Sequence, residues 1–377
     1  MAKRQFMKLF LVPTFVLITL VCTGQTNHQH GRVARFPSIP GYLSLSCDFH
    51  IHTVFSDGSV WPDIRLQEAL KDSLDAFSLT EHLEYQPHKA DIPNPDRNKS
   101  FDIVSSLAKP YEILVVKGAE ITRGMPPGHN NAIFIKDANK LLNIDSLEVF
   151  KEAKNQGAFT FWNHPNWTAQ RKDGIARLTD FHKYLINNQL LQGIEVVNDV
   201  TYSDEAFQIA LDNNLTIMGT SDIHGLVDWQ FNVSEGGHRP FTLVFAKEKT
   251  EESIKEALLA KRTLAYFNHT LIGREEWMLP LVKSAITVKE ASYIGTSSVL
   301  EISLMNNSDT PFLLLNESNY TLHQHSGLIT LEPRTVTKIQ LKAKDILEKI
   351  SLPFQVLNAV ISPGKYLHLS YDVLIKD

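Results

Sequence analysis

Residues 48–58 read Asp-Phe-His-Ile-His-Thr-Val-Phe-Ser-Asp-Gly, a pattern that indicates a short strand followed by a turn. A strand alternates its side chains between two faces, so His50 and His52 point to one side and Phe49 and Ile51 to the other. Two imidazoles on one face lie about 7 Å apart, close enough to share a metal ion. Asp57 follows in the turn and offers a carboxylate to the same ion. A His-x-His pair alone would fit surface residues equally well, so the prediction depends on the rest of the chain.

Residues of metal-binding type recur where other predicted strands end. Apolar, strand-like runs are followed by a set of titratable residues, namely Glu81, His82, Glu120, His164, Asp222 and His224. In a β/α barrel the C-terminal ends of the strands meet at one mouth, where such enzymes place their chemistry. Burying these side chains unpaired would be costly, whereas a shared cation explains them together. His129 lies before a strand in a Pro-Pro-Gly loop and, taken alone, would be a loop histidine. Glu81 would either orient His82 or be structural.

The alternation of strands and helices predicts the fold. Strand-like runs over residues 41–283 alternate with stretches of helical periodicity at 62–74, 146–156, 203–213 and 250–261. This order favours a mainly parallel sheet that is closed, or nearly closed, into a β/α barrel. Residues 284–377 contain short alternating apolar runs between Asn-, Ser- and Pro-Gly-rich turns, with one helix-like interruption at 343–350. We therefore expect an α/β barrel at 41–283 and an all-β sandwich at 284–377.

The N-terminus has the features of an export signal. Basic residues among the first eight precede an apolar run at residues 9–21 that is short for a membrane span. We expect a signal peptide at residues 1–24 and a polar linker at 25–40. Cys22 lacks the small preceding residues of a lipid-modified site, although a retained or lipid anchor stays open as an alternative. The predicted location is exported, periplasmic or associated with the cell envelope, with no membrane span in the mature chain.

Composition excludes several function classes. The 377 residues are 43% hydrophobic and 21% charged, with a net charge of −5 and both signs mixed. No Lys/Arg run is present, so we expect no nucleic-acid groove. The chain has no G-x-G-x-x-G and no Walker motif, which disfavours nucleotide-binding α/β architectures. Once residues 1–24 are removed, Cys47 stands alone and no disulfide framework is possible. The oligomeric state is not predicted.

The ordered set of candidate ligands resembles that of the PHP (polymerase and histidinol phosphatase) superfamily. The set is His50, His52, Asp57, His82, Glu120, His129, His164, Asp222 and His224. The resemblance implies a distorted seven-stranded (β/α)7 barrel that holds up to three divalent ions. It implies a first ion at His50, His52, Glu120 and Asp222, a second at Asp57, His82 and His224, and a third at Glu120, His129 and His164. Residues 61–62, 84–88 and 162–167 further resemble exported bacterial PHP phosphodiesterases with an added β-domain.

The ligand types indicate the chemistry. Mixed imidazole and carboxylate sets suit Zn, Mn or Fe better than Mg or Ca, so we expect two to three ions of the former kind. Metals about 3.5–4 Å apart can bridge a water and hold both oxygens of a phosphoryl displacement. The predicted function is hydrolysis of phosphodiester or phosphomonoester bonds of small organic phosphates by a metal-bridged hydroxide. We expect Glu120, Asp222 and His224 to be catalytic, with His224 or a metal-bound water protonating the leaving group.

Two loop arginines and two other function classes complete the predictions. Arg123 and Arg239 lie in Gly/Pro-rich loops and are candidates to bind phosphate oxygens; the alternative is that both are solvated cations. An amidohydrolase also begins with His-x-His but usually bridges its metals with a carboxylated lysine, where this chain has Glu120. An inactive envelope protein that binds metal or glycan is the other alternative. It is disfavoured because no ligand position carries an inert residue.

Overall fold

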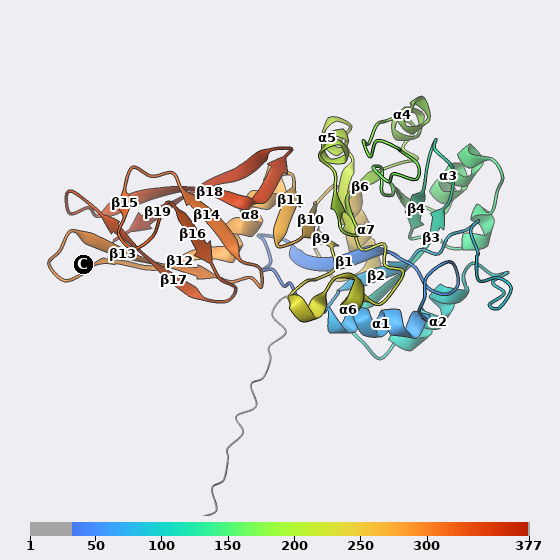
Figure 1. Cartoon of the computed structure of the whole chain (residues 1–377), viewed down its shortest axis with the longest axis horizontal. Coiled ribbons are helices and arrows are strands. Elements are labelled where there is room, and N and C mark those ends of the chain that lie inside the picture. The colour runs from blue at the N-terminus through green and yellow to red at the C-terminus, as the bar shows by residue number, and fades with distance from the viewer. Residues whose placement is uncertain (1–31, 376–377) are drawn as a thin grey trace, which may run out of the picture.

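The structure is a computed structural model that describes residues 32–375, and its two parts lie at opposite ends of the long axis of the molecule (Figure 1). The first part is an α/β barrel and the second a β-sandwich, which confirms the predicted fold class. The predicted signal peptide at 1–24, and residues 25–31 of the predicted linker, lie outside the described residues. Within the described range, no helix is both long and apolar enough to cross a membrane.

Strands and helices alternate in the first part, as the sequence predicts. Its strands are β1 (Leu43–Ile51), β2 (Ala76–Leu79), β3 (Leu114–Ile121), β4 (Asn130–Ile133), β5 (Phe159–Trp162), β6 (Gly193–Asn198), β7 (Thr201–Tyr202), β8 (Thr216–Thr220), β9 (Phe241–Ala246), β10 (Thr263–Phe267) and β11 (Thr270–Gly273). Its helices are α1 (Pro62–Lys71), α2 (Lys99–Ala108), η1 (Ala138–Leu141), α3 (Ser146–Asn155), α4 (Asp180–Asn187), α5 (Asp204–Asp212), α6 (Val227–Gln230), η2 (Val233–Glu235), α7 (Glu251–Leu259) and α8 (Glu275–Ala285), of which η1 and η2 are 3₁₀ helices.

Local capping explains where the predicted helices begin. Pro62 opens α1 at a position where its missing N–H is no loss. The hydroxyl of Ser203 accepts a hydrogen bond from the N–H of Ala206 at the start of α5, and Thr250 accepts one from Ser253 at the start of α7. Each cap satisfies a backbone donor that the first helical turn leaves without a partner.

The barrel sheet runs in the order β10-β9-β1-β2-β3-β4-β5-β6-β8. The pairs β1–β2, β2–β3, β5–β6 and β6–β8 are parallel, whereas β4 is antiparallel to β3 and β5, and β9 is antiparallel to β1 and β10. The sheet is thus less uniformly parallel than predicted. No helix separates β3 from β4, and a connection without a crossover can only reverse the strand direction.

The two ends of the barrel sheet approach each other at a seam between β8 and its neighbours β1 and β9, without a hydrogen-bonded ladder among the described residues that would close the barrel. In residues 32–375, the seam between β8 and β1 has a single backbone bridge, Ile51 with Ile223, and no ladder. Instead, Gly219 N–H donates to Thr242 Oγ1 over 3.0 Å, and that hydroxyl donates back to Gly219 O over 2.8 Å. A Cβ at position 219 would lie 2.8 Å from Ala265 Cβ, so the close approach of β8 to β10 requires glycine.

Arg65 of α1 joins the two sides of the seam. Its side chain is 0% exposed. Nε donates to His52 O over 2.9 Å, Nη2 donates to the carbonyls of residues 223 and 224 over 3.0 and 2.9 Å, and Nη1 donates to the carbonyl of residue 225 over 2.7 Å. Glu68 balances its charge at 2.7 Å from Nη1. One buried guanidinium therefore holds the end of β1 against the segment that follows β8.

The second part is built from two sheets packed face to face. Its strands are β12 (Ile286–Tyr293), β13 (Val299–Asn306), β14 (Phe312–Asn316), β15 (Thr321–Leu322), β16 (Leu328–Leu331), β17 (Val336–Lys342), β18 (Lys349–Ser362) and β19 (Lys365–Leu374). One sheet has the order β12-β13-β17-β15, and the other contains β16, β14, β18 and β19. β18 also pairs in parallel with β11, so the barrel sheet continues into the sandwich (Figure 1).

The helix-like interruption predicted at 343–350 is wrong. Residues 343–348 form no helix, and β18 begins at Lys349. Ile350, Leu352 and Phe354 are buried while the residues between them are not, which is the period of a strand. Packing against the opposite sheet decides the structure here, and the sequence analysis did not identify β18 at all.

We expect Arg65→Ala to lower the free energy of unfolding by about 3–5 kcal/mol, because it leaves the carboxylate of Glu68 and several carbonyls buried without a donor. Guanidinium denaturation followed by circular dichroism measures this. Arg177→Ala is the matched control, since Arg177 pairs with Asp173 at the exposed surface, and we expect it to change the midpoint little. Equal effects of the two substitutions would contradict the role of Arg65 at the seam.

Candidate metal centre

The structure brings all nine candidate ligands to one end of the barrel. His50 and Glu120 lie on β1 and β3, and His52, His82, Asp222 and His224 lie within a few residues of the ends of β1, β2 and β8. Asp57 lies in the turn after β1, and His164 follows β5. His129 precedes β4, but because β4 is antiparallel to β3, its first residue lies at the same mouth. The direction of β4 therefore explains the one ligand that did not fit the strand-end pattern.

Glu120 is the centre of the cluster. Its Oε1 lies 3.0 Å from His129 Nδ1, 3.6 Å from His164 Nε2 and 3.7 Å from His50 Nε2. Its Oε2 lies 2.7 Å from His82 Nδ1 and 3.5 Å from the Nε2 atom of residue 52. Asn163 orients the carboxylate by donating to Oε1 over 2.8 Å. A single carboxylate thus faces imidazoles from several strands.

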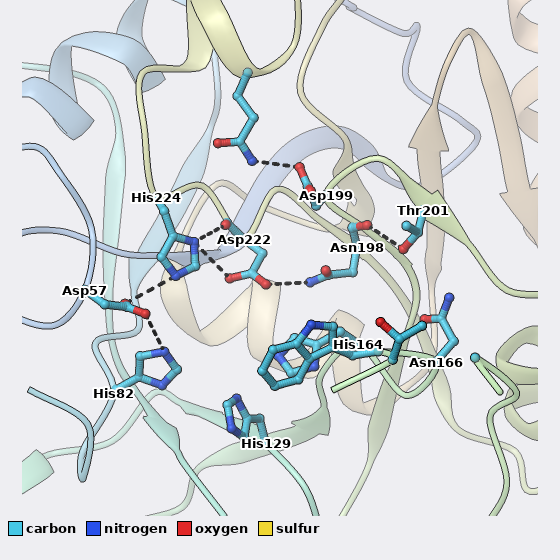
Figure 2. A pocket seen from close by; sticks show the side chains of 14 residues that line it. Asp57, His82, His129, His164, Asn166, Asn198, Asp199, Thr201, Asp222 and His224 are labelled. Carbon is cyan, nitrogen blue, oxygen red and sulfur yellow. Dashed lines mark hydrogen bonds and ion pairs between the residues drawn. The ribbon is translucent and has the colours of Figure 1, made fainter. Parts of the chain in front are cut away.

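Two aspartates complete the cluster (Figure 2). Asp222 Oδ1 lies 3.1 Å from Nε2 of both His50 and His52. Asp57 Oδ1 lies 3.2 Å from His224 Nε2, and Asp57 Oδ2 lies 3.3 Å from the Nε2 atom of residue 82. The carboxylates therefore alternate with the imidazoles around a shared space.

The potential ligand atoms form three overlapping groups, within each of which they lie no more than 4.8 Å apart: His52, Asp57, His82 and His224; His50, His52 and Glu120; and His82, Glu120 and His129. The grouping differs in detail from the one implied by the family resemblance. His52 joins the group of Asp57, and His82 takes the place of His164 beside Glu120 and His129.

Several of these atoms are buried and have no hydrogen-bond partner in the part of the chain that the structure describes. They are His50 Nε2, His52 Nε2, Asp57 Oδ1, Glu120 Oε2, His129 Nδ1, His164 Nδ1 and Asp222 Oδ1. Such atoms are costly to bury without a partner. Although the rings and carboxylates lie close together, they point toward common centres rather than along hydrogen bonds to each other. This donor set fits divalent cations that accept imidazole nitrogen and carboxylate oxygen.

The electrostatics of the cluster couple acids and bases. Burial alone would raise the pKa of Glu120, but the imidazoles of His82 and His129 hold it well below its usual range. Burial alone would lower the pKa of His82, but the carboxylates of Glu120 and Asp57 raise it to about 10. In the same way Asp57 and Asp222 raise the pKa of His224 to about 9 against the effect of burial. Without cations the acids are therefore balanced by protons on imidazoles.

The sequence analysis missed Glu195, which holds two ligands in place. Glu195 lies on β6 and is 1% exposed. Its Oε1 lies 2.7 Å from His50 Nδ1, and its Oε2 accepts from the backbone N–H of His164 over 2.7 Å. Thr220 and Asn198 donate to the remaining lone pairs. The available signal was a single acid inside an otherwise apolar strand.

Glu81 supports the turn that carries Asp57. Its carboxylate accepts from Thr53 N–H over 3.1 Å and from the hydroxyls of Thr53 and Ser56. Of the two alternatives for this residue, the contacts favour the structural one, since none is with the His82 ring. Gly58 completes the turn, because a Cβ there would lie 2.7 Å from the carbonyl carbon of His52. The turn can therefore fold back over the end of β1.

Two ligands have left-handed backbone conformations that are uncommon for residues with a side chain. The φ angle is 29° at His164 and 47° at Asp222. Both lie just beyond the ends of strands, where a reversed φ turns the side chain toward the mouth. Such conformations persist where surrounding contacts enforce them, and they concentrate at functional sites.

The two arginines predicted to bind substrate do not reach the cluster. Arg239 is 2% exposed and donates from Nε to Asp72 over 2.7 Å and from Nη1 to Asp48 over 3.1 Å. Arg123 pairs with Glu84 and the carbonyl of residue 143, and both flank a separate surface hollow. This corrects the prediction, because each guanidinium is engaged by carboxylates or carbonyls away from the metal cluster.

A cavity of about 470 Å³ opens in front of the cluster. Six of the candidate ligands line it, namely Asp57, His82, His129, His164, Asp222 and His224. The remaining wall comes from the loop after β5, the β6–β7 turn and α6 (Figure 2). The cluster is therefore accessible to a small molecule.

We expect Glu195→Gln to weaken divalent-metal binding by about 10–100-fold, the usual cost of losing the group that orients a ligating imidazole. Isothermal titration calorimetry with Zn²⁺ or Mn²⁺ measures it. Glu148→Gln, on the exposed face of α3, is the matched control and should bind like wild type. Unchanged affinity in Glu195→Gln would show that His50 needs no such partner.

We further expect metal binding at pH 7.5 to release protons. The pKa values of His82 and His224 lie above this pH, so both rings carry a proton that ligation must displace. Affinity should then increase with pH until it levels off near pH 9–10. Calorimetry in buffers of different ionisation enthalpy counts the released protons. Binding without proton release would contradict the assigned protonation of the metal-free site.

Comparisons with known proteins place the chain in a family. A sequence family described as an Ig-like domain matches residues 286–372. No curated protein matches the chain. Two distant structures have 16% and 14% sequence identity: PsfC from Pseudomonas syringae PB-5123 (TM-score 0.41, covering 64% of this chain and 96% of that one) and an amidohydrolase from Chromobacterium violaceum (TM-score 0.34, 48% and 87%). Structural similarity as low as this does not indicate a shared function.

One solved structure is much more similar. It is a two-domain protein from Bacteroides vulgatus ATCC 8482 that contains a predicted PHP-like metal-dependent phosphoesterase. The sequences are 41% identical, the TM-score is 0.85, and the match covers 90% of this chain and 98% of that one. The chain therefore belongs to the family of two-domain proteins with a PHP-like metal-dependent phosphoesterase domain.

Proposed function

We propose that the chain is a metal-dependent phosphoesterase that hydrolyses mono- or diesters of small organic phosphates in the cavity described above. The observation that carries this proposal is the convergence of nine imidazole and carboxylate side chains, seven of which have a buried nitrogen or oxygen without a hydrogen-bond partner in the described residues. Ions held there would supply positive charge for the phosphoryl oxygens and acidify a coordinated water. The fold alone would not support this conclusion, because one fold hosts many activities.

The roles of individual residues follow from their contacts. Glu120 lies between the groups of imidazoles and is suited to bridge two ions. His224 Nδ1 lies 2.7 Å from the carbonyl oxygen of Asp222, which fixes the proton on Nδ1 and leaves Nε2 free to bind metal. We therefore propose ligation as the role of His224. Hydrolysis forms one P–O bond to water and breaks the P–O bond to the alcohol, which leaves with a proton.

The amidohydrolase alternative is weaker. Its usual bridging group is a carboxylated lysine, and in the described residues the cavity lining contains none. Cys47, a possible nucleophile, is fully buried in the core. We also propose that the protein is exported, which is supported only by the basic and apolar pattern of residues 1–24.

We expect a chelator to abolish hydrolysis of 4-nitrophenyl phosphate esters and Zn²⁺, Mn²⁺ or Fe²⁺ to restore it. His50→Ala and Glu120→Gln should each lower kcat/KM by roughly 10³-fold or more, since metal charge contributes several kcal/mol to the transition state. His323→Ala, an exposed histidine of the sandwich, is the control. Circular dichroism checks that each variant folds. Wild-type rates in either site variant, or preference for an amide or lactone over the phosphate esters, would refute the proposal.

A further inference from the structure

The part of the cavity lining that does not consist of candidate ligands bears on which alcohol the phosphate is attached to. It includes Asn166, Asn198 and Asp199 (Figure 2). Trp167 of the loop after β5 and Gln230 of α6 also belong to it. The volume of about 470 Å³ leaves room for a ring-sized group beyond the phosphate. The chemistry of this wall therefore selects among leaving groups.

Neutral hydrogen-bonding groups dominate the wall. In the described part of the chain, no lysine or arginine lines the cavity. Its lining does contain amide and hydroxyl groups, from Asn166, Asn198, Thr201 and Gln230. These groups both donate and accept, which suits a ligand whose own groups do both. A leaving group with further phosphates would need cations that the wall does not offer. Nucleotides and bisphosphates are thus disfavoured.

Trp167 provides a fixed apolar surface. Its ring centroid lies 5.1 Å from that of His164 and 5.5 Å from that of His129, and its backbone N–H donates to His164 O over 2.9 Å. The residue is nevertheless 45% exposed. An indole held beside the ligands can pack against the C–H face of a ring. Among residues 32–375, it is the one aromatic side chain of the cavity lining besides the imidazoles. Recognition of a quaternary ammonium uses several aromatic rings.

Asp199 supplies a carboxylate to the cavity lining. Its Oδ1 accepts from Gln230 Nε2 over 2.7 Å, which joins α6 to the β6–β7 turn. The only side-chain donor to the carboxylate within residues 32–375 is Gln230, and the residue lines the cavity. The backbone N–H donates to Thr220 O over 3.1 Å and holds a φ of 52°. A carboxylate has more lone pairs than this one contact uses, and an ionised carboxylate is a strong acceptor for a hydroxyl.

We propose that the substrate is a phosphate ester of a polyhydroxylated ring, a sugar or a cyclitol. Its hydroxyls bind Asp199 and Gln230, and its ring packs on Trp167. This inference rests on the proposed phosphoesterase function, since it names the alcohol released by that reaction. The specificity then comes from the leaving-group side, while the ligands hold the phosphate.

The test separates binding from hydrolysis on the metal-loaded chain. Calorimetry compares a hexose 1-phosphonate, which cannot be hydrolysed, with cyclohexylmethyl phosphonate, which has equal charge and a ring of equal size but no hydroxyls. A trimethylammonio-ethyl phosphonate represents cationic leaving groups. We expect the hexose compound to bind about tenfold or more tightly than either, the effect of one or two additional hydrogen bonds. Hydrolysis of 4-nitrophenyl phosphate is measured in parallel.

Two substitutions test whether Asp199 and Trp167 cause the preference for the hexose compound. Asp199→Asn keeps a side chain that tolerates the left-handed backbone but loses the charged acceptor, and Trp167→Ala removes the ring surface. Each should reduce the preference for the hexose compound by about threefold or more. Asp212→Asn on the exposed end of α5 and Tyr111→Ala at the opposite end of the barrel are matched controls and should retain it.

Each outcome decides between the two proposals. Hydrolysis of the aryl ester without preference for the hexose compound, or with preference for the cationic one, overturns the inference and leaves the phosphoesterase proposal intact. A hexose preference that depends on Asp199 and Trp167, without hydrolysis of any ester, overturns the phosphoesterase proposal and retains the polyol site. Absence of both overturns both.

Discussion

The structure depends on the polar seam between β1 and β8. His50 and His52 lie on one side of it, and Asp222 and His224 on the other, so the cluster needs these two segments to lie side by side. Backbone pairing contributes one bridge there. The buried guanidinium of Arg65 joins the end of β1 to residues 223–225. A buried guanidinium without partners would strongly destabilise the fold, but the N–H groups of Arg65 all meet carbonyls or a carboxylate. Removing either the arginine or its partners therefore lowers stability by more than the intact set of interactions adds to it.

The seam also sets the charge balance of the site. It brings Asp222 within 3.1 Å of two imidazoles and places Glu120 opposite them. Without cations the acids keep their charge because neighbouring imidazoles hold protons. With cations the same rings become neutral ligands. Folding, proton uptake and metal binding are therefore linked equilibria, and substitutions at the seam should change metal affinity as well as stability.

The sequence indicated the candidate ligands more completely than the groups that position them. His50, His52 and the residues at strand ends follow from strand periodicity and from the convergence of strands in a barrel. Arg65 could not be found in this way, because an arginine in an amphipathic helix usually faces solvent. Arg239 was misassigned because its partners Asp48 and Asp72 come from distant segments. Glu195 was the exception, since an acid within an apolar strand was visible and was not used.

The second domain is continuous with the barrel rather than appended to it. β18 pairs in parallel with β11 through Leu271 with Ala359 and Ile272 with Val360, so it covers an edge that would otherwise expose unpaired backbone groups. Asn358 of β18 donates over 2.8 Å to the carbonyls of residues 269 and 311, one in each part of the molecule. β11 is the last strand of the barrel sheet and β18 belongs to a sheet of the sandwich. The main-chain hydrogen bonds between β11 and β18 therefore hold the two domains in one orientation. A β-sandwich held in this way stabilises the strands that lead, through β10 and β9, to β1 and the cluster.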